Sequence, residues 1–289
     1  MELAPNLRAD AFAGTAIAYL RYRPPYPVSL LADLLARANA SDHFLLLDLA
    51  SGPGRLALDL AAAFEQVCAI DLEPEMVAVG RREAERRGIG NIKWLVSRAE
   101  DAEISPNSID LITIGDAFHR LDQKVIAQRA LVWLKPGGCI ALLGTDGLLT
   151  GGEAWKETVA EVAMRWMARA FPEGWAMSQE GAELGPAGAE RVLRQAGFAD
   201  VESRAFVEPR DWSFEEIAGN LRSTSVCSNK ALGEHVEAFE ADLRRALGGE
   251  SGGVFHEALN ATTFALSAAG AIFQYLSASS GRTNSRYVL

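Results

Sequence analysis

The residues best suited to chemistry lie in one stretch near the start of the chain. Residues 45–60 read LLLDLASGPGRLALDL, which is an apolar run, an acidic residue, a glycine-rich turn and a helix start. An apolar run without alternation is typical of a buried parallel strand. Gly52 and Gly54 allow a sharp turn and close approach to a ligand, and the free N–H groups of the following helix point at that ligand. The stretch predicts a strand–turn–helix unit that cradles a ligand.

Two acidic residues narrow the choice of ligand. A second apolar run, residues 67–70, ends at Asp71, nineteen positions after Gly52. An acidic side chain there can accept hydrogen bonds from ribose hydroxyls, as in any adenosine-containing cofactor, NAD included. Asp48 precedes the glycine turn, where a carboxylate repels a pyrophosphate but can hold a cationic or amino-bearing group. This favours S-adenosylmethionine, which carries an ammonium and a sulfonium and no phosphate.

Five segments follow one another in chain order: residues 48–54, 69–76, 97–101, 108–119 and 134–138. Together they span about residues 40–145 and resemble the motifs of the class I S-adenosylmethionine-dependent methyltransferases. Ala50 departs from that resemblance, because a glycine is common at this place in the family's first motif. Residues 21–27 and 212–225 resemble segments of the small-molecule, methyltransferase type 11-like branch of that family.

The resemblance implies roles for particular residues. Asp71 would bind the ribose, Ala99 and Glu100 would border the adenine, and Gly115 would expose a carbonyl to the cofactor's ammonium. The segment with Tyr19 and Arg23 would fold over the site, where an aromatic residue or an arginine meets the cofactor's carboxylate. The expected cofactor-binding residues are Asp48, Ala50, Ser51, Gly52, Gly54, Asp71, Leu72, Met76, Ala99, Glu100, Gly115, Tyr19 and Arg23.

His119 is the candidate general base. Its ordinary pKa lies near neutrality, which suits removal of a proton from a hydroxyl or amine during methyl transfer. Asp116 is a weaker alternative at the same edge of the predicted sheet. The competing interpretation is that positioning alone supplies the acceleration, because a sulfonium is already an activated donor.

Strand-like and helix-like segments alternate along the chain, which predicts βαβ crossovers and a parallel sheet. We expect an α/β fold: a Rossmann-like, doubly wound sheet of about seven strands, the last antiparallel, with helices on both faces and a helical lid insertion. The predicted strands are 44–48, 67–71, 92–97, 109–115, 138–144, 201–207 and about 259–266. The predicted helices are 28–39, 54–64, 74–87, 122–134, 153–170, 190–196, 211–222 and 229–247.

The whole chain reads as one domain in four parts. These are an N-terminal cap (1–40), a core (41–145), a lid insertion (about 150–185) and C-terminal strands and helices (186–276), followed by a polar tail expected to be poorly ordered. In the insertion, aromatic and methionine side chains recur near helical spacing. They predict either a helix that packs on the core or a lid lining a pocket for an apolar or aromatic substrate.

Charge, residue spacing and the lack of targeting segments argue against nucleic-acid, metal and membrane binding. A net charge of −10 over 289 residues disfavours a surface that tracks nucleic-acid phosphates. The four histidines form no metal-binding pair, so no metal is expected. Three widely spaced cysteines fit a reducing compartment. With no secretory signal apparent and the apolar stretch 261–276 short for a membrane span, we expect a cytoplasmic protein without a membrane partner. Oligomeric state stays open.

The functional hypothesis is methyl transfer from S-adenosylmethionine to an O, N or C nucleophile of a small, apolar or aromatic metabolite. One alternative is a non-methylating protein of the same fold that binds S-adenosylmethionine or S-adenosylhomocysteine. Another is an NAD(P)-dependent oxidoreductase, which Asp48 and the later motifs disfavour.

Overall fold

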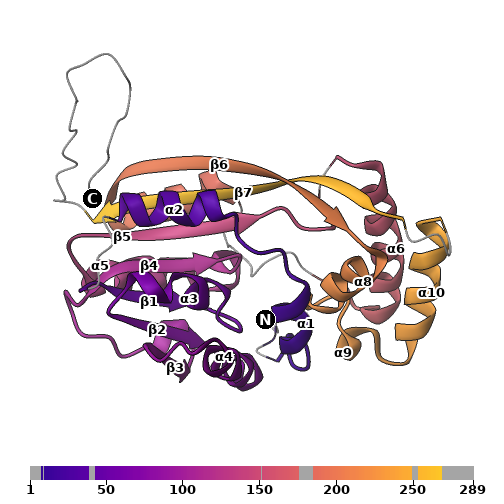
Figure 1. Ribbon diagram of the computed structural model, residues 1–289, viewed down its shortest axis with the longest axis horizontal. Helices are drawn as coiled ribbons and strands as arrows, with labels where there is room; N and C mark the ends of the chain where they lie inside the picture. Colours follow the sequence, from indigo (N-terminus) through magenta and orange to yellow (C-terminus); the bar gives the residue numbers. More distant parts are fainter. Residues whose placement is uncertain are drawn as a thin grey trace, which may run out of the picture.

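The computed structural model describes residues 8, 10–38, 43–150, 152–175, 185–248 and 253–268. Within them, seven strands form one sheet in the order β3-β2-β1-β4-β5-β7-β6 (Figure 1). The strands are β1 (Leu45–Leu49), β2 (Gln66–Asp71), β3 (Ile92–Val96), β4 (Ile109–Gly115), β5 (Leu134–Thr145), β6 (Phe198–Trp212) and β7 (Phe255–Ala268). Neighbours among β1 to β5 pair in parallel, whereas β7 runs antiparallel to β5 and β6. The predicted fold class is confirmed.

Helices cover both faces of this sheet. They are α1 (Ala16–Tyr22), α2 (Val28–Arg37), α3 (Arg55–Leu60), α4 (Pro74–Arg87), α5 (Gln123–Trp133), α6 (Ala154–Ala170), α7 (Gly185–Ala196), α8 (Phe214–Arg222), α9 (Asn229–Leu232) and α10 (Val236–Ala246). Side chains of α2, α3 and α4 pack on one face, and those of α5 and α7 on the other. Among the described residues, no helix is long and apolar enough to cross a membrane.

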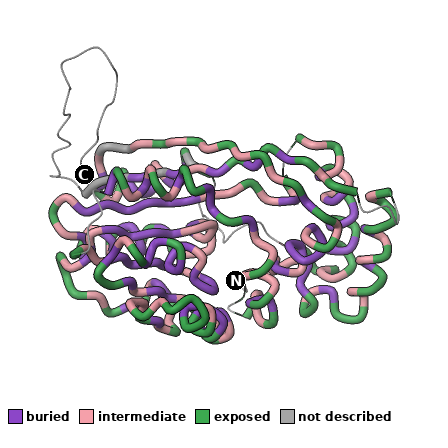
Figure 2. The backbone as a smooth tube through the Cα atoms, in the orientation of Figure 1, coloured by how far each residue is buried: buried purple, intermediate pink, exposed green. Residues whose placement is uncertain are grey.

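The central strands are buried because successive side chains point to opposite faces of the sheet, and a hydrophobic core covers each face. In β1, Leu46 belongs to the core under α2 to α4, and Leu47 and Leu49 belong to the core under α5 and α7. All three are at most 1% exposed. The central strands accordingly form the buried middle of the molecule (Figure 2).

Beyond the sheet proper, the long strands β6 and β7 reach a separate cluster of helices (Figure 1). There α6 packs against α8, α9 and α10 around an apolar centre that includes Val159, Met167 and Phe239. Trp212, at the far end of β6, is buried in the same cluster. We call α6, α8, α9 and α10 the helical unit.

A buried ion pair ties the helical unit to β7. Lys156 of α6 donates from Nζ to Glu257 Oε1 at 2.7 Å, and both side chains are at most 2% exposed. Trp212 Nε1 donates to the other oxygen of Glu257. Because a buried charge is stable only when it is paired and hydrogen-bonded, these contacts fix the position of α6.

The helix α1 lies between the core and the helical unit (Figure 1). On the core side, Ala16 packs against Met76 and Val79 of α4. On the other side, Tyr22 donates to Glu215 of α8 at 2.9 Å. A Cβ at Gly219 of α8 would lie 2.4 Å from the Tyr22 ring, so this glycine is required for the close approach of the two helices.

Most predicted elements have somewhat different bounds in the structure, and three of these differences have an identifiable physical reason. Residues 211–212 continue β6, because Asp211 and Trp212 pair with His256 and Phe255, and the helix starts only after the Ser213 capping box. The predicted helix 229–247 is broken at Gly233, whose φ is +54°. The fifth strand begins at Leu134, four residues earlier than predicted, across a register shift in its pairing with β4. The predicted polar tail lies outside the described residues.

Candidate active site

The glycine turn after β1 is held in shape by packing as well as by hydrogen bonds. Gly54 has φ +78° and is the N-cap of α3. A Cβ on Gly54 would lie 2.2 Å from Trp94 of β3, so the indole requires glycine here. Gly52 has φ +56°, and a Cβ there would meet only Tyr19, at 3.8 Å. Gly52 therefore leaves space on the side of the turn where a ligand can approach.

Ala50 occupies a left-handed backbone conformation, with φ +51°. This conformation costs an L-residue with a Cβ about 1–2 kcal/mol relative to glycine. The strain explains why glycine is common at this place in the motif. Ala50 lines the cavity described below.

Asp71, at the end of β2, is hydrogen-bonded to the glycine turn. Its Oδ2 accepts a hydrogen bond from Gly52 N at 2.7 Å and its Oδ1 accepts one from Glu73 N at 2.9 Å. Burial raises the pKa of Asp71, while the N–H groups of Glu73 and Gly52 and the charge of Arg120 lower it. Because each carboxylate oxygen can accept more than one hydrogen bond, Asp71 still has acceptor capacity for a bound ligand.

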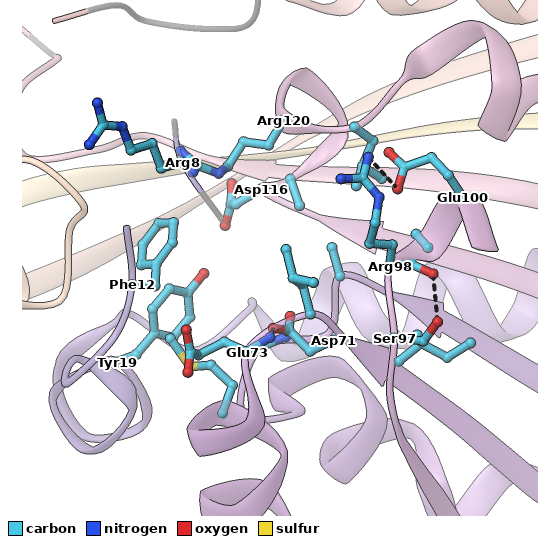
Figure 3. A pocket seen from close by; sticks show the side chains of 18 residues that line it. Arg8, Phe12, Tyr19, Asp71, Glu73, Ser97, Arg98, Glu100, Asp116 and Arg120 are labelled. Carbon is cyan, nitrogen blue, oxygen red and sulfur yellow. Dashed lines mark hydrogen bonds and ion pairs between the residues drawn. The ribbon is translucent and has the colours of Figure 1, made fainter. Parts of the chain in front are cut away.

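The far end of the site is polar. Arg98 Nη2 lies 3.5 Å from Glu100 Oε2. Glu100 Oε1 also accepts a hydrogen bond from Asp122 N at 2.8 Å, which anchors the carboxylate to the start of α5. Glu100 belongs to the 3-10 turn η3 (Ala99–Asp101), which Arg98 directly precedes, and Figure 3 shows Ser97, Arg98 and Glu100 gathered on one side of the cavity.

Asp116 follows β4 and points into the site with its carboxylate held by three hydrogen bonds (Figure 3). Its Oδ1 accepts from Thr145 N at 2.8 Å, and its Oδ2 accepts from Tyr26 Oη at 3.0 Å and Thr145 Oγ1 at 3.1 Å. The φ of Asp116 is +52°. Burial, and next the charge of Asp116, raise the pKa of Tyr26 well above its ordinary value, so the phenol stays a hydrogen-bond donor.

An arginine and two aromatic residues from distant parts of the chain meet at the site. Tyr19 of α1 and Phe12 contact edge to face, with ring centroids 6.2 Å apart. The Arg120 guanidinium, from the 3-10 turn η4 (Phe118–Arg120), lies 4.7 Å from the centre of the Phe12 ring. Burial lowers the pKa of Arg120, and the charges of Tyr19 and Asp71 raise it. The three side chains bring the N-terminal segment and the loop after β4 together.

These elements enclose a cavity of about 220 Å³ at the carboxyl edge of β1, β2 and β4 (Figure 3). Eight of the expected cofactor-binding residues line it. They are Tyr19, Ala50, Gly52, Asp71, Leu72, Met76, Ala99 and Glu100. Lining residues absent from that expectation are Arg8, Phe12, Ile70, Glu73, Ser97, Arg98, Asp116, Ala117, Arg120 and Leu121.

Asp48 lies behind the cavity rather than in its wall. It is 1% exposed, inside β1 opposite Thr113 of β4, whose hydroxyl donates to Asp48 Oδ1 at 2.8 Å. Among the described residues no hydrogen bond of good geometry reaches Oδ2. Burial raises the pKa of Asp48 to about 7, although the Thr113 hydroxyl and the nearby Ala57 N–H oppose that shift.

The other expected residues outside the cavity wall lie close to it. Ser51 and Gly54 form the turn beneath Gly52. Gly115 faces Tyr26, where a Cβ would lie 2.4 Å from the phenol oxygen. Arg23 donates from Nε to Ser223 Oγ at 2.8 Å, and its guanidinium carbon lies 4.9 Å from the centre of the Tyr19 ring.

His119 is half-buried in η4, next to the cavity residue Arg120. Burial lowers the pKa of His119 below its ordinary value, the charge of Arg120 adds to that effect, and Asp116 opposes it. The imidazole is therefore neutral at pH 7 and able to accept a proton.

Sequence signals existed for some of the missed residues. Arg120 is the neighbour of His119, and Ser97 and Arg98 stand in a motif already singled out. No pattern marked Arg8 or Phe12. Among the described residues, no group of three or more histidine, cysteine, aspartate or glutamate side chains could hold a metal ion.

Comparison with known proteins agrees with this geometry. Residues 46–138 match the model of a family described as a methyltransferase domain. A demethylmenaquinone methyltransferase of Geobacillus kaustophilus is 26% identical over 185 residues, covering 60% of this chain and 79% of that protein. A ubiquinone/menaquinone biosynthesis C-methyltransferase of Rubrivivax gelatinosus is 34% identical over 105 residues, covering 36% of this chain and 39% of that protein. For several other curated relatives, the chain spans 39–51% of their length.

Among solved structures, the YcgJ protein of Bacillus subtilis shares the fold, with a TM-score of 0.53 and 17% identity over 83% of this chain and 98% of that one. The family match covers residues 46–138 of this chain. Together with the motifs and the sheet order, these matches support a class I S-adenosylmethionine-dependent methyltransferase.

Proposed function

We propose that the chain binds S-adenosylmethionine in the cavity beside Asp71 and transfers its methyl group to an O, N or C nucleophile of a small molecule. The observation that carries the proposal is the placement of Gly52 and Asp71 on one cavity wall. When bound, S-adenosylmethionine supplies a methyl group already activated by its positive sulfonium.

The chain's own residues fit such a ligand. Asp71 has acceptor capacity for the ribose hydroxyls. Ala99 and Glu100, at the far end, would border the adenine, and Leu72 and Met76 supply apolar wall between these groups. The methionine portion would then lie toward Tyr19 and the glycine turn.

Polar groups at the methionine end suit its positive charges. Asp116 presents a carboxylate fixed by Tyr26 and Thr145. The Gly115 carbonyl, at the end of β4, would accept a hydrogen bond from the cofactor's ammonium.

Positioning is the main catalytic contribution that we propose, with His119 as general base for acceptors that lose a proton. The lowered pKa of His119 keeps it in the base form at neutral pH. If it is the base, the rate falls only below about pH 6.5, its ordinary pKa. His119→Ala should abolish this fall in rate at low pH and lower turnover about 10²-fold. If turnover and its pH dependence are unchanged, positioning of the substrates is the whole catalytic contribution.

The expectation of an apolar or aromatic acceptor rested on the side chains of residues 153–177, of which 176 and 177 lie outside the described residues. In the structure Val159, Val162 and Trp166 of α6 face α8, α9 and α10 within the helical unit. These three side chains thus have a packing role, and the polarity of the acceptor must be argued from other residues.

Binding and transfer can be measured separately. Calorimetry should detect S-adenosylhomocysteine binding, and Asp71→Ala should weaken it at least tenfold, whereas Asp59→Ala on the exposed face of α3 should leave it unchanged. An effect of Asp71→Ala within twofold would overturn the ribose assignment. Tritium transfer from labelled S-adenosylmethionine to a panel of phenols, amines and carboxylic acids tests the reaction. Binding without transfer would favour the non-methylating alternative, and nicotinamide fluorescence on binding would favour the NAD(P) alternative.

A further inference from the structure

A second cavity, of about 370 Å³, lies between the N-terminal segment and the helical unit. Its walls come from the N-terminal segment, from the end of α6 and the turn after it, and from residues around the start of α9. The residues that matter below are Arg8, Asp10, Phe171, Glu173 and Lys230. We call this cavity the side groove.

The side groove adjoins the cofactor cavity at the end where methyl transfer would occur. Arg8 lines both cavities. Figure 3 shows Arg8 beyond Phe12, with its side chain pointing away from Asp71, on the side opposite Arg98 and Glu100. Because we place the adenine at Glu100 and the methionine portion at Tyr19, the groove continues from the methionine end.

Two cationic side chains of the groove, Arg8 and Lys230, act on the same carboxylate, Asp10. Lys230 Nζ donates to Asp10 Oδ2 at 2.5 Å and to the Asp10 carbonyl at 2.9 Å. Lys230, and to a smaller extent Arg8, lower the pKa of Asp10. Two cations therefore surround one carboxylate, in a chain whose net charge is −10. Glu173, after the end of α6, is the second acidic residue of the groove.

The groove has apolar side chains beside the charged ones. Phe171 and Pro172 are the large apolar residues of its described wall. Ser225 and Ser228 add hydroxyl groups. Such a lining fits a ligand that carries a charged group as well as an apolar part.

We propose that the side groove binds the methyl acceptor, and that the acceptor is a small molecule whose anionic group, a carboxylate or phosphate, is held by Arg8 and Lys230. This rests on the proposed function, since it assumes that the cofactor's methionine portion lies at Tyr19. Arg8 suits a carboxylate or phosphate through its forked guanidinium, and Lys230 adds a second positive charge.

The test uses acids and their neutral partners as probes. Full-length protein saturated with S-adenosylhomocysteine is titrated in a calorimeter with matched pairs: 4-hydroxybenzoate and 4-hydroxybenzamide, and phosphoserine and serine. We expect an acid to bind at least tenfold more tightly than its neutral partner. Arg8→Met and Lys230→Met should each weaken binding of that acid at least fivefold, and Lys230→Met, which lies outside the cofactor cavity, should leave S-adenosylhomocysteine affinity unchanged within twofold. Glu173→Gln should strengthen acid binding, and Arg86→Met, on the exposed side of α4, should change nothing.

Other results would overturn the assignment. They are equal binding of acid and neutral partner, binding of no acid in the panel, or acid affinity insensitive to both Arg8→Met and Lys230→Met. Because Lys230 also holds Asp10, a loss confined to Lys230→Met and accompanied by weaker S-adenosylhomocysteine binding would indicate a structural role and count against the proposal. Failure of the unmodified protein to bind S-adenosylhomocysteine refutes the proposed function instead.

Discussion

Asp48→Asn measures how much unfolding free energy is lost when a buried, weakly paired carboxyl group must ionise. Burial raises the pKa of Asp48 from 3.8 to about 7. The substitution keeps the shape of the side chain and removes its charge, and the amide oxygen can still accept the Thr113 hydroxyl. We expect the variant to gain stability relative to the parent as the pH rises.

The direction follows from proton binding. Between pH 3.8 and about 7 the unfolded chain has released the Asp48 proton, whereas the folded chain retains it. The parent therefore loses stability as the pH rises through this window, the reverse of a carboxylate paired with a cation. At about 1.4 kcal/mol per pKa unit, the rise of about three units corresponds to a loss of about 4 kcal/mol in the unfolding free energy of the parent. About 2–3 kcal/mol of that loss occurs between pH 5 and pH 8.

Guanidinium denaturation at pH 5 and pH 8 measures the free energy of unfolding of both proteins. The stability of Asp48→Asn minus that of the parent should rise by about 2–3 kcal/mol between the two pH values. A constant cost of burying the new amide cancels in this comparison. Asp59→Asn, at an exposed site beside Arg87, should show no such rise. A rise below about 0.5 kcal/mol, or a fall, would refute the reasoning about Asp48.

Three further substitutions test the packing around the site and the helical unit. Lys156→Met should cost about 3–5 kcal/mol in unfolding free energy because it leaves Glu257 buried and charged; a loss under about 1 kcal/mol would show that the pair is dispensable. Ala50→Gly should stabilise the protein by about 1 kcal/mol by relieving the positive φ, and destabilisation would contradict that account. Gly54→Ala should lower the melting temperature by several degrees, and Trp94→Leu in that background should restore part of the loss; no restoration would place the cause in the backbone alone.

Much of the core was predictable because its signals are local. The uninterrupted apolar run of β1, the glycine turn and the spacing to Asp71 each depend on a few neighbouring residues. Helix α4, predicted as 74–87, begins with a proline and ends at Gly88 in a left-handed conformation, and both signals stand in the sequence. Where start and stop residues are this explicit, the boundaries of an element follow from them.

Asp48 shows why the details of the site were harder. The predicted strand ended at Asp48, but β1 runs from Leu45 to Leu49. A shift of one residue places Asp48 inside the strand, paired in register with Ala69 and Thr113. Because the strand continues past Asp48, its carboxylate is covered by the neighbouring strands and does not stand at the open edge of the sheet.

The cavity wall formed by Arg8, Phe12 and Arg120 could not be read from local patterns. Arg120 meets Phe12 across more than a hundred residues of sequence, and neither residue belongs to a motif that fixes its direction. The apolar spacing of α6 gave a different difficulty. It predicted the helix but left open whether its apolar face meets a ligand or other helices, and only the positions of α8, α9 and α10 decide between them.

The position of α1 has a thermodynamic consequence for the order of ligand binding. This helix carries Tyr19 to the cofactor cavity and, three residues later, Tyr22 to the tight contact with Gly219. A ligand that shifts the helical unit must therefore also change the free energy of binding at the cofactor cavity. By reciprocity, the factor by which cofactor tightens acceptor binding equals the factor by which acceptor tightens cofactor binding. Gly219→Ala should reduce equally the increase in acceptor affinity caused by cofactor and the increase in cofactor affinity caused by acceptor, while each ligand keeps its own contacts.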